Sequence, residues 1–183
     1  MRRSNLAIAI LFVLLAALPG AKADAQTEER VQLRDGRVSF VLPAGFKPMS
    51  KEAINVKFAR KGAAYAPEFA YSNERQNVSV AVGFAGSGLQ AAQLDELRKF
   101  FEAQFETNIP GVEWIEREII TRNGTRWIHL HLKAKAIDTG IINDMYATVF
   151  DGQMLFFNFN STIAQYEKYK ESLLKSAQTI TVK

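Results

Sequence analysis

Two glutamates and two histidines lie on either side of Asn123-Gly124, a dipeptide typical of tight turns. Asn-Gly between β-rich segments is a strong signal for a two-residue hairpin turn, and such a turn fixes the register of both strands. Counting outward from the turn predicts these cross-strand pairs: Arg122 with Thr125, Ile120 with Trp127, Glu118 with His129, Glu116 with His131, and Trp114 with Lys133.

Side chains alternate along a strand, so all these residues share one face of the hairpin. Two imidazoles two residues apart, facing two carboxylates, can bind a transition metal or form an acid–base cluster. The alternative is a solvated sheet face whose charge pairs contribute about a few tenths of a kcal/mol each. The usual metal-site spacings are absent, which favours the solvated face. We therefore predict no metal ligand and no cofactor, and keep metal binding as the alternative.

If the next strand pairs through the loop at 136–140, Thr148 and Tyr146 lie beside His129 and His131. The candidate ligand-binding residues on this face are then Glu116, Glu118, Trp127, His129, His131 and Tyr146. The opposite face is expected to be core, with Ile115 and Ile119 against Ile128, Leu130 and Leu132, and Arg117 as the polar exception.

Other chemical motifs are weak or missing. The segment 86–91 (GSGLQA) matches the loose dinucleotide-binding pattern G-x-G-x-x-A, but the chain continues into hairpins rather than repeated βαβ units. The sequence has no G-x-S-x-G, no H-E-x-x-H and no P-loop, only two histidines, and no cysteine. We predict no catalytic residues, and an enzyme ranks below a binding module or a carrier.

The elements that must position these residues form an α+β pattern. Asp35-Gly36, Asn123-Gly124 and Asp151-Gly152 predict three hairpins. Further strands are expected at 54–60, 68–72, 77–84 and 179–182, and helices at 89–107 and 163–177. This order predicts a mostly antiparallel sheet with helices packed on its faces.

Both helices carry apolar residues at helical spacing. Ser87 with Gln90, and Thr162 with Gln165, are candidate capping boxes. The residues expected to be buried are Leu97, Phe101, Phe105, Tyr166 and Leu173, with Arg98, Glu102, Lys168 and Glu171 in water. The phenylalanines at 150, 156, 157 and 159 are divided by alternation between two sheet faces, and both faces therefore need cover. We expect core there, with an apolar pocket between helix and sheet as the alternative.

The N-terminus has the pattern of a cleavable secretory signal at residues 1–23: a basic start, an apolar run from Leu6 to Leu18, and two small-x-small sites. Residues 24–30 are expected to be flexible, and 31–183 to form one domain. Cleavage removes three of 23 basic residues and none of the 19 acidic ones, so the mature chain is nearly neutral, which argues against nucleic-acid binding. No later segment is expected to span a membrane.

The segment Val38-Ser39-Phe40-Val41-Leu42-Pro43-Ala44-Gly45-Phe46 resembles the opening strand of the PsbP-like family, and the stretch from Ser161 through Leu173-Leu174 to Ile180 is similar to its ending. The family contains an extrinsic photosystem subunit and many exported bacterial proteins without a settled activity. The resemblance covers about 34–182 and implies an α/β/α sandwich without a shared catalytic residue set. We therefore expect a periplasmic or secreted, non-enzymatic binding or assembly module with an envelope protein as its partner. The alternative is a small-ligand or metal carrier using Glu116, Glu118, His129 and His131.

Overall fold

A computed structural model describes residues 29–58, 66–109, 111–135 and 139–183. The strands are β1 (Arg30–Leu33), β2 (Val38–Val41), β3 (Lys47–Pro48), β4 (Phe69–Ser72), β5 (Val78–Ala85), β6 (Glu113–Arg122), β7 (Thr125–Lys135), β8 (Gly140–Phe150), β9 (Gln153–Thr162) and β10 (Thr181–Val182). The helices are α1 (Lys51–Phe58), the 3₁₀ turn η3 (Ala91–Gln93), α2 (Leu94–Asn108) and α3 (Ile163–Gln178).

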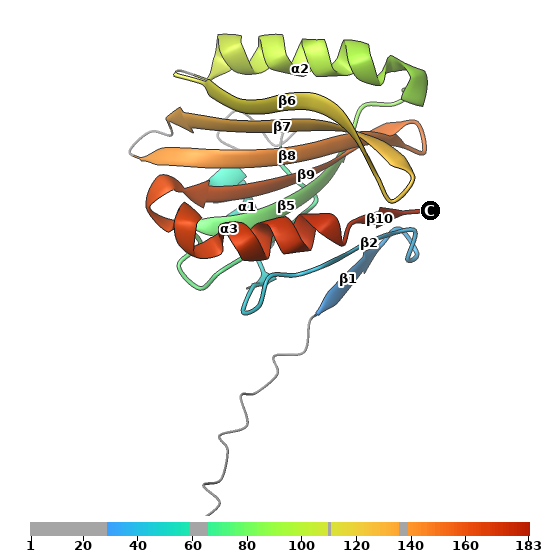
Figure 1. Cartoon of the computed structure of the whole chain (residues 1–183). Helices are drawn as coiled ribbons and strands as arrows, with labels where there is room; N and C mark the ends of the chain where they lie inside the picture. Colours follow the sequence, from blue (N-terminus) through green and yellow to red (C-terminus); the bar gives the residue numbers. More distant parts are fainter. Residues whose placement is uncertain (1–28, 59–65, 110, 136–138) are drawn as a thin grey trace, which may run out of the picture.

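The main sheet has seven antiparallel strands in the order β3-β4-β5-β9-β8-β7-β6. A second sheet, β1-β2-β10, is also antiparallel. In Figure 1, α3 crosses in front of the main sheet and α1 lies behind it. The predicted α+β class, with a mostly antiparallel sheet and helices on its faces, is confirmed.

Each of the three turn signals closes a hairpin as predicted. Arg122 pairs with Thr125, Phe150 with Gln153, and Leu33 with Val38 across a longer turn. Asn123 and Gly124 have φ values of 49° and 78°, the left-handed pair that a tight hairpin turn requires. The local chemistry of the turn therefore fixes the register of the β6–β7 hairpin at its closed end.

Two hydrophobic clusters lie on opposite faces of the main sheet. The first, on the α3 side, joins the small sheet through Phe40 to Trp127, Tyr146 and Phe157. The second lies under α2 and includes Leu94, Ile128, Leu130, Met145 and Met154. Phe157 and Phe159 belong to the first cluster and Phe156 packs against the second, so alternation divides them as expected. Both faces of β7 are consequently core over part of their length.

The predicted strand at 54–60 is wrong, because residues 51–58 form α1. Alternation of Ile54, Val56 and Phe58 resembles a strand pattern, yet Ile54 is buried and Val56 is 74% exposed. The Ser50 hydroxyl accepts a hydrogen bond from the Ala53 amide at 3.2 Å, which is an N-cap contact.

The capping predictions for the two longer helices also need correction. Before α2, the Gln93 side chain accepts a hydrogen bond from the Gln90 amide at 2.9 Å, so the capping contact lies three residues later than the predicted pair Ser87 and Gln90. The glycines at 86 and 88 lead into η3 rather than directly into α2. Thr162 stands at the N-cap of α3, but its side chain makes no capping hydrogen bond.

The residues predicted to lie on the inner faces of α2 and α3 do face the protein, but most of them are less buried than expected. Leu173 is buried, whereas Leu97, Phe101, Phe105 and Tyr166 are half-buried. Lys168 and Glu171 are exposed as expected. Arg98 and Glu102 instead form a half-buried ion pair along α2.

A β-bulge changes the register at the open end of the β6–β7 hairpin. Glu116 pairs with His131, but the register shifts between Trp114 and Glu116, so Trp114 pairs with Leu132 rather than with Lys133. A bulge sets two residues opposite one and turns the preceding side chains to the other face. Trp114 therefore stacks on Phe105 of α2, with ring centroids 6.3 Å apart, and Ile115 is left 44% exposed instead of in the core.

The predicted signal peptide at 1–23 and most of the segment at 24–30 lie outside the described residues. Within the part that the structure describes, no helix is both long and apolar enough to cross a membrane.

Candidate functional site

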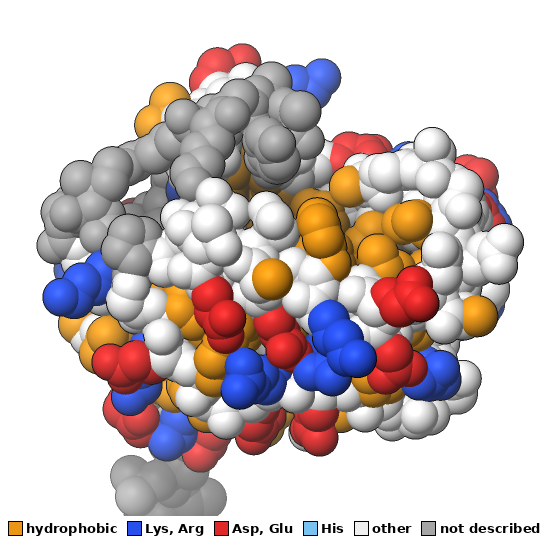
Figure 2. Space-filling model, turned by 90° about the horizontal axis from the view of Figure 1, so that it is seen from above, with side chains coloured by type: hydrophobic (Ala, Val, Ile, Leu, Met, Phe, Trp, Pro, Cys, Tyr) orange, Lys and Arg blue, Asp and Glu red, His pale blue; other side chains and the backbone are white. Residues whose placement is uncertain are grey.

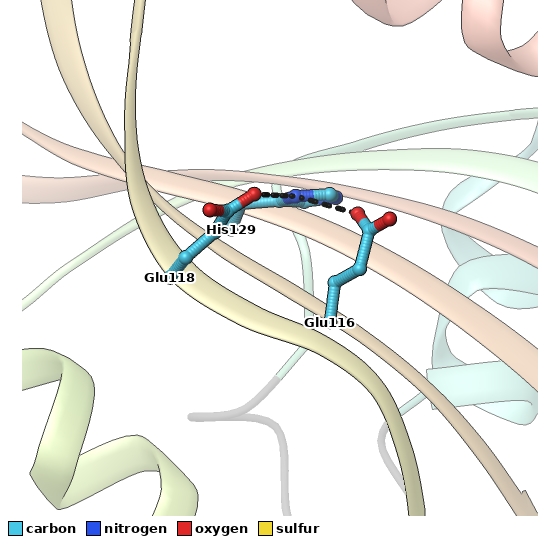
Figure 3. A group of neighbouring side chains, drawn as sticks. All are labelled: Glu116, Glu118 and His129. Atoms are coloured by element: carbon cyan, nitrogen blue, oxygen red, sulfur yellow. Dashed lines mark ion pairs between the residues drawn. The ribbon is translucent and has the colours of Figure 1, made fainter.

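The β6–β7 hairpin brings Glu116, Glu118 and His129 together on the face that carries α3. Glu118 pairs with His129, and Glu116 pairs with His131 one step further from the turn. The Glu116 carboxylate nevertheless reaches diagonally to His129, where Oε2 lies 3.3 Å from Nδ1. Glu118 Oε1 lies 4.0 Å from the same nitrogen. Figure 3 shows both carboxylates directed at one edge of the imidazole.

His129 is 6% exposed, whereas the side chains of Glu116 and Glu118 are 52% and 58% exposed. The imidazole is therefore held in place by its surroundings while the two carboxylates can rotate in water. This burial does not fit the solvated sheet face that the sequence favoured, because one partner of each charge pair is removed from water.

Asp144 of β8 fixes the other edge of the His129 ring. Its Oδ1 lies 2.6 Å from His129 Nε2, and its Oδ2 accepts a hydrogen bond from the Tyr146 hydroxyl at 3.1 Å. An ionised carboxylate can only accept hydrogen bonds, so Nε2 carries the ring proton and its N–H group donates the hydrogen bond to Asp144. The remaining nitrogen, Nδ1, is thereby aimed at Glu116 and Glu118.

Tyr146 forms the floor under the imidazole. Its ring stacks on His129 with centroids 4.5 Å apart and an interplanar angle of 8°. The Arg122 guanidinium lies 4.6 Å from the centroid of the same tyrosine ring. Burial, with a contribution from the Asp144 charge, raises the pKa of Tyr146 well above its ordinary value, so the hydroxyl remains a donor.

His131 is close to this group but points elsewhere. Its Nε2 lies 3.4 Å from the hydroxyl of Tyr166 on α3, and its ring centroid is 6.3 Å from that of His129. Burial lowers the pKa of His131, which favours the neutral imidazole. The two histidines therefore do not converge on one point.

The structure brings together three of the six predicted ligand residues. Glu116, Glu118 and His129 offer ligand atoms that all lie within 4.8 Å of one another. Tyr146 supports the ring, His131 faces α3, and Trp127 is 2% exposed within the core.

Asp144 was not among the predicted site residues, because β8 lies two residues out of the expected register. Tyr146 pairs with His129 and Asp144 with His131, where Thr148 and Tyr146 were expected. Lys135 pairs with Gly140, whereas the expected register would have paired it with Ile142. One signal was available: Asp144 is the only charged residue in the otherwise neutral strand β8.

The arrangement is suited to a divalent cation. Three carboxylates surround one imidazole, and a proton or a metal ion on Nδ1 would offset part of this negative charge. Zinc sites with three protein ligands place N and O donors about 2.0–2.2 Å from the ion and leave a position for water or a ligand. A metal-binding histidine usually donates its other N–H to a carboxylate, as His129 does to Asp144.

A pocket of about 270 Å³ adjoins this group under α3. Glu116, His129 and Asp144 form one side of it, and Tyr166 and Lys170 of α3 stand opposite. Water or a small ligand can therefore reach the cluster from the side that faces α3.

Comparison with solved structures defines the class of fold. The chain resembles cyanobacterial PsbP (CyanoP) from Synechocystis sp. PCC 6803, with a TM-score of 0.61 and 14% identity over 92% of this chain and 99% of that one. It also resembles LpqN of Mycobacterium tuberculosis, described as involved in cell envelope biogenesis, with a TM-score of 0.58 and 10% identity over 87% of each chain.

A third similar structure is PA94 from Pseudomonas aeruginosa, described as a putative regulator of unknown function, with a TM-score of 0.53 and 14% identity over 85% of this chain and 97% of that one. No family model matches the sequence, and no curated protein matches it. At these identities the likeness shows the fold alone, and the fold is PsbP-like.

Proposed function

We propose that this protein is an exported binding module that holds a divalent transition-metal cation between Glu116, Glu118 and His129. The observation that carries the proposal is the orientation of His129. Asp144 accepts from Nε2, and Nδ1 faces both glutamates at 3.3 and 4.0 Å. Without a cation or a proton on Nδ1, a lone pair would face two negative charges in a half-buried site, which is unfavourable.

Zinc suits this ligand set better than a hard cation such as Mg²⁺, because one of the three donors is an imidazole nitrogen. The two exposed glutamates need only rotate to shorten the distances between ligand atoms. Three protein ligands would leave room for a further ligand, such as a water molecule from the adjoining pocket under α3, which fits a carrier that exchanges its cargo.

Isothermal titration calorimetry with zinc tests the proposal. We expect one zinc per chain for the wild type, and at least about a tenfold weaker affinity for the double variant Glu116→Gln, Glu118→Gln. Glu113→Gln is the matched control, because Glu113 is exposed on the same strand and pairs with Lys133 outside the cluster. Equal binding by all three proteins would overturn the proposal.

A histidine comparison separates His129 from His131. His129→Ala should abolish tight zinc binding, whereas His131→Ala should retain most of it, because His131 is turned towards Tyr166. Circular dichroism must first confirm that His129→Ala folds, since the ring stacks on Tyr146. Loss of zinc binding in His131→Ala alone would contradict the assignment of ligands.

Export is supported by the signal pattern at residues 1–23 and by the envelope role in the description of LpqN, which shares the fold. Mass analysis of the protein recovered from a periplasmic fraction should show a chain that starts after Ala23 or Ala25. A chain that starts at Met1 would contradict this part of the proposal. Co-purification from the native envelope would identify the expected partner protein.

A further inference from the structure

A second recess lies on the opposite side of the main sheet from the Glu–His cluster. It occupies about 470 Å³ between α2 and the sheet, within the range of small-molecule sites. Figure 2 looks onto α2 and shows hydrophobic side chains gathered in a hollow on this side. The described residues that line the recess are Ala66, Phe84, Ala85, Gly86, Leu89, Leu97, Phe100, Phe101, Phe105, Met145, Ala147, Met154 and Phe156.

None of these described lining residues carries a polar side chain. The apolar face of α2 is also incompletely covered: Leu97, Phe101 and Phe105 are half-buried, although their spacing is that of a core face. Phe100 is 57% exposed at the edge. Apolar surface left open in this way is unfavourable in water and is typical of a ligand site.

Small residues of the main sheet lie beneath the recess and leave space for it. The Phe156 ring lies across Gly83, and a Cβ at residue 83 would come within 2.2 Å of its Cζ atom. Any side chain at residue 83 would therefore push this ring into the recess. Ala147, on the neighbouring strand β8, adds only a methyl group to the same floor. The other face of these strands carries Tyr146 and Phe157 instead, and both of these side chains are buried.

We propose that this recess binds the hydrocarbon chain of an amphiphile, such as a fatty acid or the acyl chain of a lipid. A peptide segment would bury backbone N–H and C=O groups against lining residues that, among those described, offer no polar side chain to pair with them, which is costly. A hydrocarbon chain brings no such groups. Its polar end would remain in water at the mouth, where Ala85 and Gly86 are exposed. The inference is independent of metal binding.

Calorimetric titration with laurate, below its micelle concentration and without added metal, tests the proposal. We expect saturable binding of one laurate per chain. Octanoate should bind at least about tenfold more weakly, because burial of each further methylene is worth roughly a fourfold change in affinity. A dependence on chain length of this kind identifies the hydrocarbon, not the carboxylate, as the part that is recognised.

Two tryptophan substitutions locate the site. Ala85→Trp places a large ring at the exposed mouth and should weaken laurate binding by at least about tenfold. Ala103→Trp is the matched control, because Ala103 is exposed on α2 and does not line the recess, and its affinity should equal that of the wild type.

Absence of laurate binding, or equal binding by wild type and Ala85→Trp, would overturn the proposal. A second copy of this chain is another possible occupant. In that case laurate fails to bind, and analytical ultracentrifugation shows a dimer for the wild type and a monomer for Ala85→Trp, which also overturns it.

Discussion

Gly83→Ala is a substitution whose cost follows from one contact. Gly83 is buried in the interior of β5, and its φ is not positive, so the backbone itself accepts alanine. The added Cβ would meet three ring atoms of Phe156 at 2.2, 2.7 and 2.9 Å. Distances below 3 Å force the ring to move, and overpacking of this kind typically costs about 1–3 kcal/mol.

An opposing effect reduces this cost. Alanine in a strand interior is more stable than glycine by about 0.5–1 kcal/mol, because glycine loses more conformational freedom on folding. The two effects combine to a net loss of at most about 2.5 kcal/mol, and from their midpoints we expect Gly83→Ala to lower the free energy of unfolding by about 1 kcal/mol. Urea denaturation followed by circular dichroism measures this difference.

The same substitution in a Phe156→Leu background provides the control. Leucine removes the ring atoms that the new Cβ would meet, so Gly83→Ala should become neutral or stabilising there, and the double-mutant cycle should give a clear coupling energy. An equal effect of Gly83→Ala in both backgrounds would refute the account of this contact.

Three further substitutions test other parts of the structure. Burial lowers the pKa of Lys57 to about 8, so the unfolded chain binds more protons than the folded chain between about pH 8 and 10.5. Stability measured by chemical denaturation should therefore rise with pH across that interval, and in Lys57→Met this rise should disappear. A flat pH profile in the wild type would contradict the burial of this ammonium group. Ser50→Ala should lower stability by about 0.5–2 kcal/mol through loss of the α1 cap, whereas no change in a thermal melt would argue against that cap. Asp144→Asn should weaken zinc binding by about 10–100-fold, as observed for carboxylates that orient metal-binding histidines, and unchanged zinc affinity would show that Asp144 does not orient His129.

The sequence was sufficient for features that depend on local chemistry. Asn123-Gly124 favours one turn type, and the Glu118–His129 and Glu116–His131 pairs follow by counting from it. The bulge before Glu116 could not be counted in advance, because nothing in the alternation of residues 113–120 marks it. Packing of Trp114 on Phe105 accompanies this change of register, and that contact joins two separate elements.

The candidate site depended on contacts that are distant in the sequence. His129 is buried because β8 lies beside it and Tyr146 stacks on its ring, and α3, more than thirty residues later, brings Tyr166 to the neighbouring His131. The error in α1 had a local cause, since Ile54, Val56 and Phe58 alternate as a strand does while Ser50 caps a helix.

Nitrogen-15 NMR of the His129 ring during zinc addition tests the central claim most directly, because it reports on each ring nitrogen separately. The account predicts that zinc changes the Nδ1 resonance to that of a metal-bound nitrogen, while Nε2 keeps its proton and its hydrogen bond to Asp144. The His131 ring should change little. Zinc on Nε2 of His129, or on His131 alone, would contradict the site proposed between Glu116, Glu118 and His129.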